Sequence, residues 1–360
     1  MPALFDKELL QLHWHKQRAW NAVPAAVMIG ALLAAGIVGG DPRAGMVAAS
    51  GAFTVGMGSL FQRLGKSRVA PMLWSTLGMG VAALCGSLVG HAGSPGTVVN
   101  AAGAGFFAAM LLALGPGAAW IGQQCAIIAL VASGYPVGTG EALARAGFIV
   151  AGGLLQTAWT LGVWRLRFPA GDPSAEDDPF EGFSSAVRTL RAQFTPGAET
   201  LRFALRQSAT LAVGAELARA TGLFNGYWVP MTALLVLKAD FRQTFRRGLE
   251  RVAGTLLGAG LATLLVHGLR LEPAMIGALI VLFAWLGYTT FNVNYAVYAV
   301  FLTAYIIFLL DFGGLDAHAV VLHRTLNTVF GGLLALGSYA TVLFRAPWQG
   351  RRSAPTPDSL

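Results

Sequence analysis

The stretch Tyr227–Gly260, YWVPMTALLVLKADFRQTFRRGLERVAGTLLGAG, combines an apolar run, a basic patch and a second apolar run that is rich in small residues. The first apolar run stops at Lys238, and the second starts at Val252. The segment between them is rich in arginine. We interpret this order as two membrane helices joined on the cytoplasmic side, because loops rich in Lys and Arg stay in the cytoplasm.

The composition of the whole chain is typical of a membrane protein. Of its 360 residues, 55% are hydrophobic and 12% are charged, against roughly 25% charged residues in an ordinary soluble domain. The 46 glycines fit helices that pack closely through small residues, since lipid supplies no hydrophobic force to press helices together. We therefore predict an all-α, polytopic membrane protein.

The net charge of +8 does not indicate a nucleic-acid-binding protein, because the cations sit in short clusters between apolar runs. Such clusters are topology signals. The two cysteines, Cys85 and Cys125, lie inside predicted spans without a CxxC spacing. We expect free thiols, no metal site and no cofactor. A Walker A motif is also absent from the sequence, so direct ATP drive has no support.

Apolar runs of about 17 to 25 residues predict approximately twelve membrane spans. They are Trp20–Val38, Ala44–Leu60, Val69–Val89, Gly96–Leu114, Ala118–Ser133, Leu143–Trp164, Leu201–Thr221, Phe224–Leu237, Val252–Leu269, Ala274–Thr290, Val293–Leu310 and Ala319–Phe344. Clusters of Lys and Arg lie before the first span, after the second, between the sixth and seventh, after the eighth and after the last. This alternation places both termini in the cytoplasm.

The chain also carries signs of an internal duplication. Leu77-Gly78-Met79-Gly80 matches Leu257-Gly258-Ala259-Gly260, and Arg145 with Gly152-Gly153 matches Arg324 with Gly331-Gly332. The shared offset of about 180 residues predicts two parallel six-helix repeats. We call residues 1–167 the first half and residues 201–345, the second repeat, the second half. Residues 168–200 form a predicted cytoplasmic linker, and residues 346–360 a predicted flexible cytoplasmic tail.

The predicted linker contains a periodic apolar pattern. Phe180, Phe183, Val187, Leu190 and Phe194 recur at intervals of three and four residues. This spacing predicts a short amphipathic helix that lies on the membrane surface. The alternative is a linker helix that packs on the cytoplasmic face of the protein itself.

A family resemblance rests on the stretch quoted above. Tyr227-Trp228-Val229-Pro230 with Thr232, then Asp240-Phe241, and Arg251 followed by Gly254-Thr255-x-x-Gly258, resemble the signature of the fusaric acid resistance (FUSC-like) and aromatic acid exporter family. The resemblance implies a multi-pass protein of the bacterial inner membrane that exports aromatic carboxylic acids, in some members with a separate periplasmic adaptor subunit. The chain departs from the family pattern at Lys238, where an amide or another polar residue is common.

A carboxylate that crosses the membrane interior needs cations or oriented N–H donors, because an uncompensated charge is costly there. Lys238 and Arg251 flank the predicted cytoplasmic turn, and Arg324 lies near the start of the last span with Asn327 one turn later. These four residues are candidate substrate contacts. The alternative is that the cations anchor the helices at the membrane surface.

The predicted eighth span is short and contains Pro230, and short or interrupted spans point to transport sites. Within it Tyr227, Trp228 and Thr232 offer aromatic faces and a hydroxyl group to a substrate. The alternative for the two aromatic residues is the belt at the membrane interface. Because the first half lacks the matching motifs, we expect the second half to supply most of the site.

Four residues are candidates for coupling transport to protons. They are Glu216, Asp240, Asp311 and His323. Arg219, one turn after Glu216, is the expected partner of that carboxylate. The alternative reading for the residues around the final loop is that they are ordinary solvated side chains.

The leading hypothesis is a transporter, not an enzyme, that exports organic carboxylates under the membrane potential, by proton exchange, or both. Aromatic acids are the class that the resemblance implies. The alternatives are an anion channel of the malate-channel type and a non-transporting scaffold that binds anionic lipid or an envelope partner. The expected partners are an organic anion and the lipid bilayer, while a periplasmic adaptor and self-association remain open.

Overall fold

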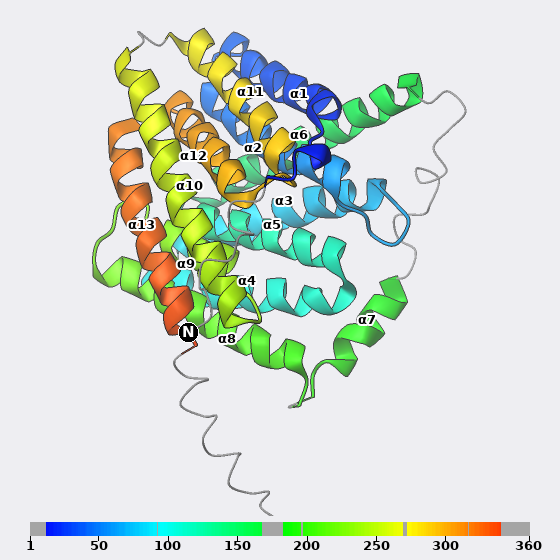
Figure 1. Ribbon diagram of the computed structural model, residues 1–360, viewed down its shortest axis with the longest axis vertical. Coiled ribbons are helices and arrows are strands. Elements are labelled where there is room, and N and C mark those ends of the chain that lie inside the picture. The colour runs from blue at the N-terminus through cyan, green and yellow to red at the C-terminus, as the bar shows by residue number, and fades with distance from the viewer. Residues whose placement is uncertain are drawn as a thin grey trace, which may run out of the picture.

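The computed structural model describes residues 12–91, 93–167, 183–195, 197–268, 272–315 and 317–339. The predicted tail and residues 168–182 and 196 of the predicted linker lie outside these ranges. Within them the chain folds into thirteen α-helices, which form the bundle shown in Figure 1. The described part contains no β-strand, only an isolated bridge between Leu64 and Ser67. The predicted all-α class is confirmed.

Six long helices make up the first half, after a short 3-10 helix, η2. The bounds are η2 Trp14–Lys16, α1 Ala19–Val38, α2 Pro42–Phe61, α3 Val69–His91, α4 Ser94–Met110 with its 3-10 extension η3 Leu111–Leu114, α5 Pro116–Ser133 and α6 Thr139–Arg167. Proline occupies the first turn of α2, α4 and α5, where the backbone N–H groups have no partner inside the helix. At α2 the Asp41 carboxylate accepts a hydrogen bond from the Ala44 backbone N–H at 3.0 Å, which caps the helix.

The remaining helices follow the segment that the structure leaves undescribed. Their bounds are α7 Phe183–Ala192, α8 Glu199–Ala220, α9 Trp228–Val236, α10 Phe241–Gly268, α11 Pro273–Thr290, α12 Tyr295–Phe312 and α13 Ala317–Gly337. Helix α7 falls where a short amphipathic helix is predicted, and it extends along the edge of the bundle in Figure 1.

Ten of the described helices are long and apolar enough to cross a membrane, instead of the twelve spans predicted. Helices α8 and α9 do not qualify. Helix α8 carries five charged residues in its 22. Helix α9 has nine residues, which is about 14 Å of helix at 1.5 Å per residue, less than half of the apolar thickness of a bilayer.

The structure corrects the start of the predicted ninth span. Helix α10 begins at Phe241, eleven residues before Val252, so the arginines of the basic patch lie on a helix rather than in a turn. Asp240 caps this helix by accepting a hydrogen bond from the Gln243 backbone N–H at 3.1 Å. One turn later Arg246 and Glu250 form an ion pair at 3.0 Å, a spacing that stabilises helices.

The same pairs of helices pack against each other in both halves. In the first half α2 packs on α6, α3 on α5 and α6, and α4 on α5. In the second half the counterparts α9 on α13, α10 on α12 and α13, and α11 on α12 also pack together. Between the halves α4 packs on α8, and α1 packs on α11. Each half therefore contributes its first and its fourth helix to the interface.

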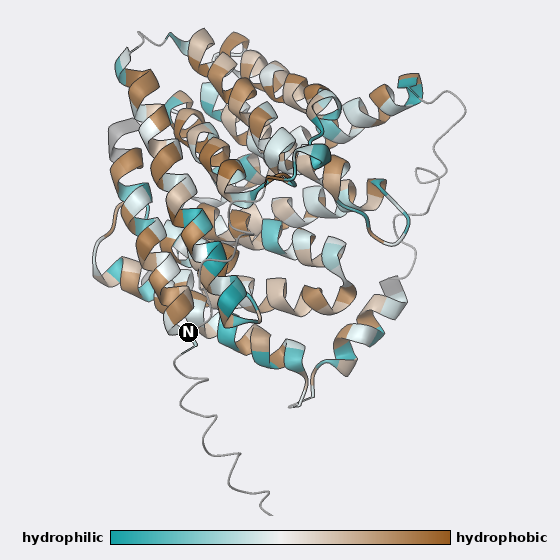
Figure 2. Cartoon of the chain, in the orientation of Figure 1, coloured by the Kyte–Doolittle hydropathy of each residue, from teal (hydrophilic) through white to brown (hydrophobic). Residues whose placement is uncertain are grey.

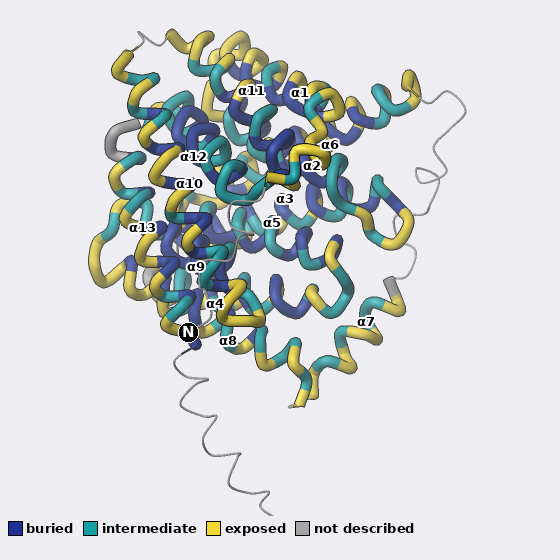
Figure 3. Tube along the Cα trace, in the orientation of Figure 1, coloured by how far each residue is buried: buried dark blue, intermediate teal, exposed yellow. Residues whose placement is uncertain are grey.

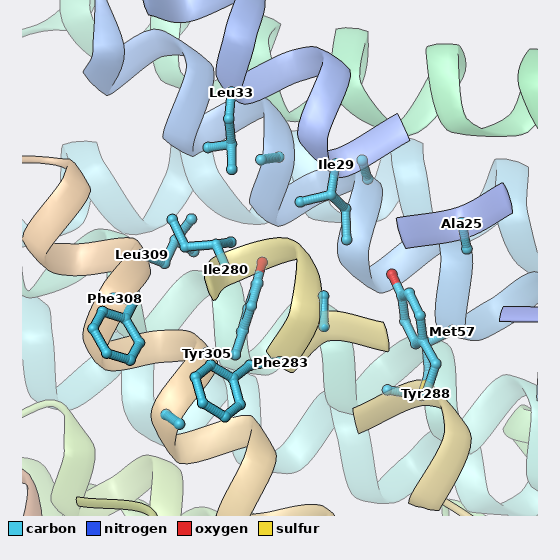
Figure 4. Close-up of a cluster of buried hydrophobic side chains, with 14 of the residues drawn as sticks. Ala25, Ile29, Leu33, Met57, Ile280, Phe283, Tyr288, Tyr305, Phe308 and Leu309 are labelled. Atoms are coloured by element: carbon cyan, nitrogen blue, oxygen red, sulfur yellow. The ribbon is translucent and has the colours of Figure 1, made fainter. Parts of the chain in front are cut away.

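The largest apolar core lies at this interface. Ile29 of α1, Phe283 of α11 and Phe308 of α12 are buried there, and Figure 4 shows their side chains gathered between these helices. Figure 3 shows that burial concentrates inside the bundle, whereas apolar residues also cover its outer faces in Figure 2. Val38 and Leu264, for example, are 89% and 74% exposed. An apolar exterior of this kind suits contact with lipid.

Candidate functional site

A large cavity opens between the two halves of the bundle. Its volume is about 1140 Å³, and α2, α5, α6, α9, α10 and α12 all contribute to its wall. The charged residues that line it are Arg43, Arg145, Lys238, Arg247 and Arg251, against Glu141 and Glu199. The lining is therefore richer in cations than in anions, which favours a negatively charged ligand.

Helix α9 places two aromatic side chains in this wall. The chain turns at Asn225, which has a positive φ of 52°, and the Trp228 backbone N–H donates to the Asn225 carbonyl at 3.1 Å. The turn brings Tyr227 and Trp228 to the start of α9, where both line the cavity. Pro230 is tolerated because it lies in the first turn. Helix α9 ends at Val236 because Leu237 adopts an extended conformation.

Arg251 of α10 is the buried cation of the cavity wall. It is 1% exposed, and it lines the cavity. Among the described residues, no hydrogen-bond partner exists for its Nε and Nη1 atoms or for the hydroxyl of Thr255, one turn later. Glu250, its neighbour in sequence, instead pairs with Arg246 and lies 3.9 Å from Arg247. Two nitrogens of this buried guanidinium thus lack a partner in the described structure, which is costly and favours the binding of an anion.

Arg324 of α13 lies behind Trp228. It is fully buried, and its guanidinium carbon stands 3.8 Å from the centre of the Trp228 ring. In the described part of the chain, none of its three guanidinium nitrogens has a hydrogen-bond partner. Arg324 does not line the cavity, so the indole ring separates the two.

Arg145 of α6, in contrast, has hydrogen-bond acceptors around its guanidinium. It donates hydrogen bonds to the Ser87 hydroxyl at 2.7 Å, to the Tyr135 carbonyl at 2.8 Å and to the Ala132 carbonyl at 3.3 Å. Arg145 and Arg324 match in the sequence duplication, yet only Arg145 has acceptors around it. Arg145 joins α6 to neighbouring segments, whereas Arg324 has no acceptor among the described residues.

Lys238 lies in the break between α9 and α10, where it lines the cavity and is half-buried. Its backbone N–H donates to the Thr244 hydroxyl at 2.9 Å, and its carbonyl accepts from Arg206 at 2.9 Å. Burial, and to a smaller extent the neighbouring positive charge of Arg247, lower the pKa of Lys238 to about 8. The ammonium is therefore mostly charged at neutral pH and loses its charge above about pH 8.

Residues 211–337 match the family described as fusaric acid resistance protein-like. This part of the chain resembles fusaric acid resistance-like proteins. The matched range contains α9, α10 and α13, and with them Trp228, Arg251 and Arg324. The resemblance that the sequence predicts is thereby confirmed.

Similar proteins occur in several bacteria. The inner membrane protein YccS of Escherichia coli strain K12 is 31% identical over 180 residues, which cover 49% of this chain and 24% of YccS. An uncharacterized protein of Synechocystis is 30% identical over 149 residues, 41% of this chain and 20% of that protein. A third, from Neisseria gonorrhoeae, is 28% identical over 155 residues, 42% of this chain and 36% of that protein.

The chain thus spans between about a fifth and just over a third of the length of these relatives. No solved structure matches it. The relative in the inner membrane and the ten apolar helices identify a multi-pass protein of the inner membrane, as predicted.

Two further site candidates of the fusaric acid resistance-like domain lie behind the cavity wall. Thr232 is buried, its hydroxyl has no partner in the described structure, and it packs on Gly331 of α13. Asn327 donates from its amide nitrogen to the carbonyls of Phe224 at 3.0 Å and Asn225 at 3.2 Å. Asn327 therefore fixes the turn before α9 on α13, and neither residue lines the cavity.

The four candidates for proton coupling also lie away from the cavity wall. Glu216 pairs with Arg219 at 2.8 Å on the exposed end of α8. Asp240 caps α10, and Asp311 lies near the end of α12. His323 packs its ring 5.2 Å from that of Phe224.

The first half contributes residues that the sequence analysis did not single out. These are Phe53 of α2 and the adjacent Gln123 and Gln124 of α5, which line the cavity. Tyr298 and Tyr305 of α12, in the second half, line it as well. Two consecutive amides in the middle of an apolar span are a signal that the sequence does carry. No group of three or more His, Cys, Asp or Glu side chains that could hold a metal ion occurs among the described residues.

Proposed function

We propose that this protein is a transporter, not an enzyme, and that it exports organic carboxylates, chiefly aromatic ones, across the inner membrane. One observation carries the proposal. The wall of the cavity holds a buried guanidinium, Arg251, without an acidic partner among the described residues. A carboxylate offers two acceptor oxygens in the geometry that a guanidinium prefers, so an organic acid that enters the cavity compensates this charge.

The remainder of the lining suits the ring of an aromatic acid. Trp228, Tyr298, Tyr305 and Phe53 line the cavity, and the hydroxyl of Tyr305 has no hydrogen-bond partner in the described structure. Offset or edge-on contact between rings adds to the burial of apolar surface. The same wall therefore supports binding of the ring and of the carboxylate.

We also propose that the twelve helices α1–α6 and α8–α13 form two parallel repeats, with both termini in the cytoplasm. The support is the set of equivalent helix pairs that pack in both halves, together with the alternation of cation clusters in the sequence. In this arrangement α8 and α9 replace two full spans. The shortness of α9 leaves room at the level of the bilayer for a cavity, as in transporters with interrupted helices.

A second candidate is an anion channel. Tyr295 and Gly313 flank opposite ends of α12, and both line the cavity. An 18-residue helix is about 27 Å long at 1.5 Å per residue, which is close to the apolar thickness of a bilayer. A cavity that follows the whole helix favours continuous conduction over alternating access.

The experiment is a flux measurement with purified protein in liposomes. We expect 4-hydroxybenzoate and fusarate to cross faster than in protein-free liposomes, and the flux of a carrier to saturate and to show exchange of labelled for unlabelled acid. Flux without exchange would favour the channel. If none of a broad panel of aromatic and aliphatic acids crosses above the background, the transporter proposal is wrong and a membrane scaffold takes its place.

A further inference from the structure

Trp228 lies between the cavity and Arg324. One part of its side chain lines the cavity, and its ring covers the Arg324 guanidinium at 3.8 Å. The cavity therefore reaches Arg251 but not Arg324, which the indole ring covers.

Neither member of this pair is held by a hydrogen bond. The Trp228 indole N–H and all three nitrogens of Arg324 have no partner among the described residues. The face of an aromatic ring compensates a cation only in part, and two carboxylate oxygens would do so better, because charge-assisted hydrogen bonds are the stronger interaction in an apolar setting. The stacked arrangement is thus one that a carboxylate can displace.

Arg145 in the first half shows that this lack of partners is not a general feature of the fold. At the matching position, Arg145 has three acceptors within 3.3 Å. Even this partly buried arginine is satisfied by the helices that it joins. Arg324 is fully buried and has no such acceptor among the described residues.

We propose that Arg324 is a second anion-binding position, in series with Arg251, and that the Trp228 ring covers it until a carboxylate takes the place of the ring. This inference rests on the proposed transport of organic carboxylates and assigns its second step. The anion first binds at Arg251 in the cavity. When the indole ring swings aside, Arg324 exchanges the ring for the carboxylate.

Cysteine labelling tests the cover directly. In an Arg324→Cys variant, we expect a charged, water-soluble thiosulfonate reagent to react slowly. Adding Trp228→Ala should speed the reaction about ten-fold or more, as expected when a closed state gives way to an open one, whereas Trp228→Phe should not. Gln123→Cys, whose side chain already lines the cavity, is the control and should react equally in both backgrounds. Wild-type protein gives the background from Cys85 and Cys125.

A second measurement covers the case in which the cysteine variant does not fold. Arg324→Met removes the charge but keeps the bulk, so the ligand-free protein should have an unchanged or higher Tm, because a buried unpaired charge is costly. The rise in Tm that benzoate causes should shrink. A structural arginine would behave in the opposite way, with a lower Tm and an unchanged benzoate effect.

The outcomes separate this inference from the transporter proposal. Labelling at position 324 that is independent of Trp228, or a benzoate effect that survives Arg324→Met, overturns the covered site even if flux is measured. Protein that shows the expected labelling and Tm changes but carries no acid across liposomes retains the covered site and refutes transport.

Discussion

Arg247 and Arg251 lie one turn apart on α10 and both line the cavity, but their surroundings differ. The guanidinium of Arg247 lies 3.2 Å from the centre of the Tyr295 ring and 3.9 Å from Glu250. In the described structure, Arg251 has neither an aromatic ring stacked on its guanidinium nor an acidic partner. A ligand carboxylate therefore gains more from Arg251 than from Arg247.

We predict that Arg251→Gln weakens the binding and flux of benzoate by roughly 10- to 100-fold, the value of a charge-assisted hydrogen bond. Arg247→Gln is the matched control and should change either quantity by less than about three-fold, as expected for a cation whose charge is already partly compensated. Initial rates in liposomes and calorimetric Kd values measure both. Equal effects of the two substitutions would contradict the assignment of Arg251.

Lys238 gives the cavity a predicted pH dependence. Its pKa in the folded protein is about 8, against an ordinary value of 10.5, so the ammonium is charged below pH 8 and neutral above it. Binding of a carboxylate should weaken several-fold as the pH on both sides rises from about 7 to about 9. Lys238→Gln should flatten this profile, and Lys238→Arg should move it to higher pH. A wild-type profile equal to that of Lys238→Gln would show that Lys238 does not contact the ligand.

The lowered pKa of Lys238 also makes the stability of the folded protein depend on pH. Because folding favours the neutral form of Lys238, the charged form is penalised in the folded protein below the folded pKa. That penalty is relieved as the pH rises from about 8 toward 10.5. Lys238 therefore contributes a stability that increases with pH in this window, in the direction opposite to its contribution to anion binding.

At the level of helices, the position of α9 depends on a close approach to α13. A methyl group on Gly331 would come within 2.5 Å of the Val229 carbonyl oxygen and 2.6 Å of the Thr232 Cβ. Neither neighbour moves easily, since one is backbone and the other a β-branched side chain. The glycine thus fixes the distance between α9, which carries Trp228, and α13, which carries Arg324.

We predict that Gly331→Ala destabilises the protein by about 1–3 kcal/mol, the usual cost of overpacking, and lowers Tm in detergent. Gly332→Ala is the neighbouring control, because its added methyl would lie 3.9 Å from Val252 and should be neutral. If the two variants melt at the same temperature, α9 does not depend on this contact.

Helix α10 shows where hydropathy fails to locate an element. Its first three turns carry Arg242, Arg246, Arg247 and Arg251, so an apolar window begins only at Val252. Capping by Asp240 and the ion pair of Arg246 with Glu250 extend the helix through this basic segment. Both signals are present in the sequence, but neither contributes to an average hydropathy.

On the scale of the whole molecule, the cavity lies between two halves that contribute different things. The first half supplies Phe53, Gln123 and Gln124 to the wall, and the second supplies the unpartnered cations. Both halves therefore contribute to the cavity wall, and the buried arginine without a partner for two of its nitrogens, Arg251, comes from the second half.

We predict that a membrane potential alone drives export. A potential that is negative on the cytoplasmic side favours the exit of a monoanion by about 2.3 kcal/mol per 100 mV, or roughly fifty-fold in concentration. Liposomes with a potassium diffusion potential and equal pH on both sides measure this effect. The neutral methyl ester of the acid is the control, since it feels no potential. Flux that appears only with a pH gradient would instead require proton exchange.

The membrane class, the family resemblance of residues 211–337 and most helix bounds follow from the amino-acid sequence alone. In lipid every backbone N–H and C=O must be paired within the chain, so a long apolar run has one stable form, the helix. The bounds of α1, α3 and α11 agree with the predicted spans to within two residues. The signature around Trp228 and Arg251 is likewise local, and it can be read without a structure.

Only the tertiary structure decided which cations have partners. Arg145 and Arg324 occupy matching positions in sequence, and the difference between them lies in acceptors contributed by other helices. The placement of the Trp228 ring over Arg324, and the opening of the cavity between halves, likewise depend on contacts between segments far apart in the chain. Hydropathy and spacing report the neighbours of a residue along the chain, whereas the cost of a buried charge depends on its neighbours in space.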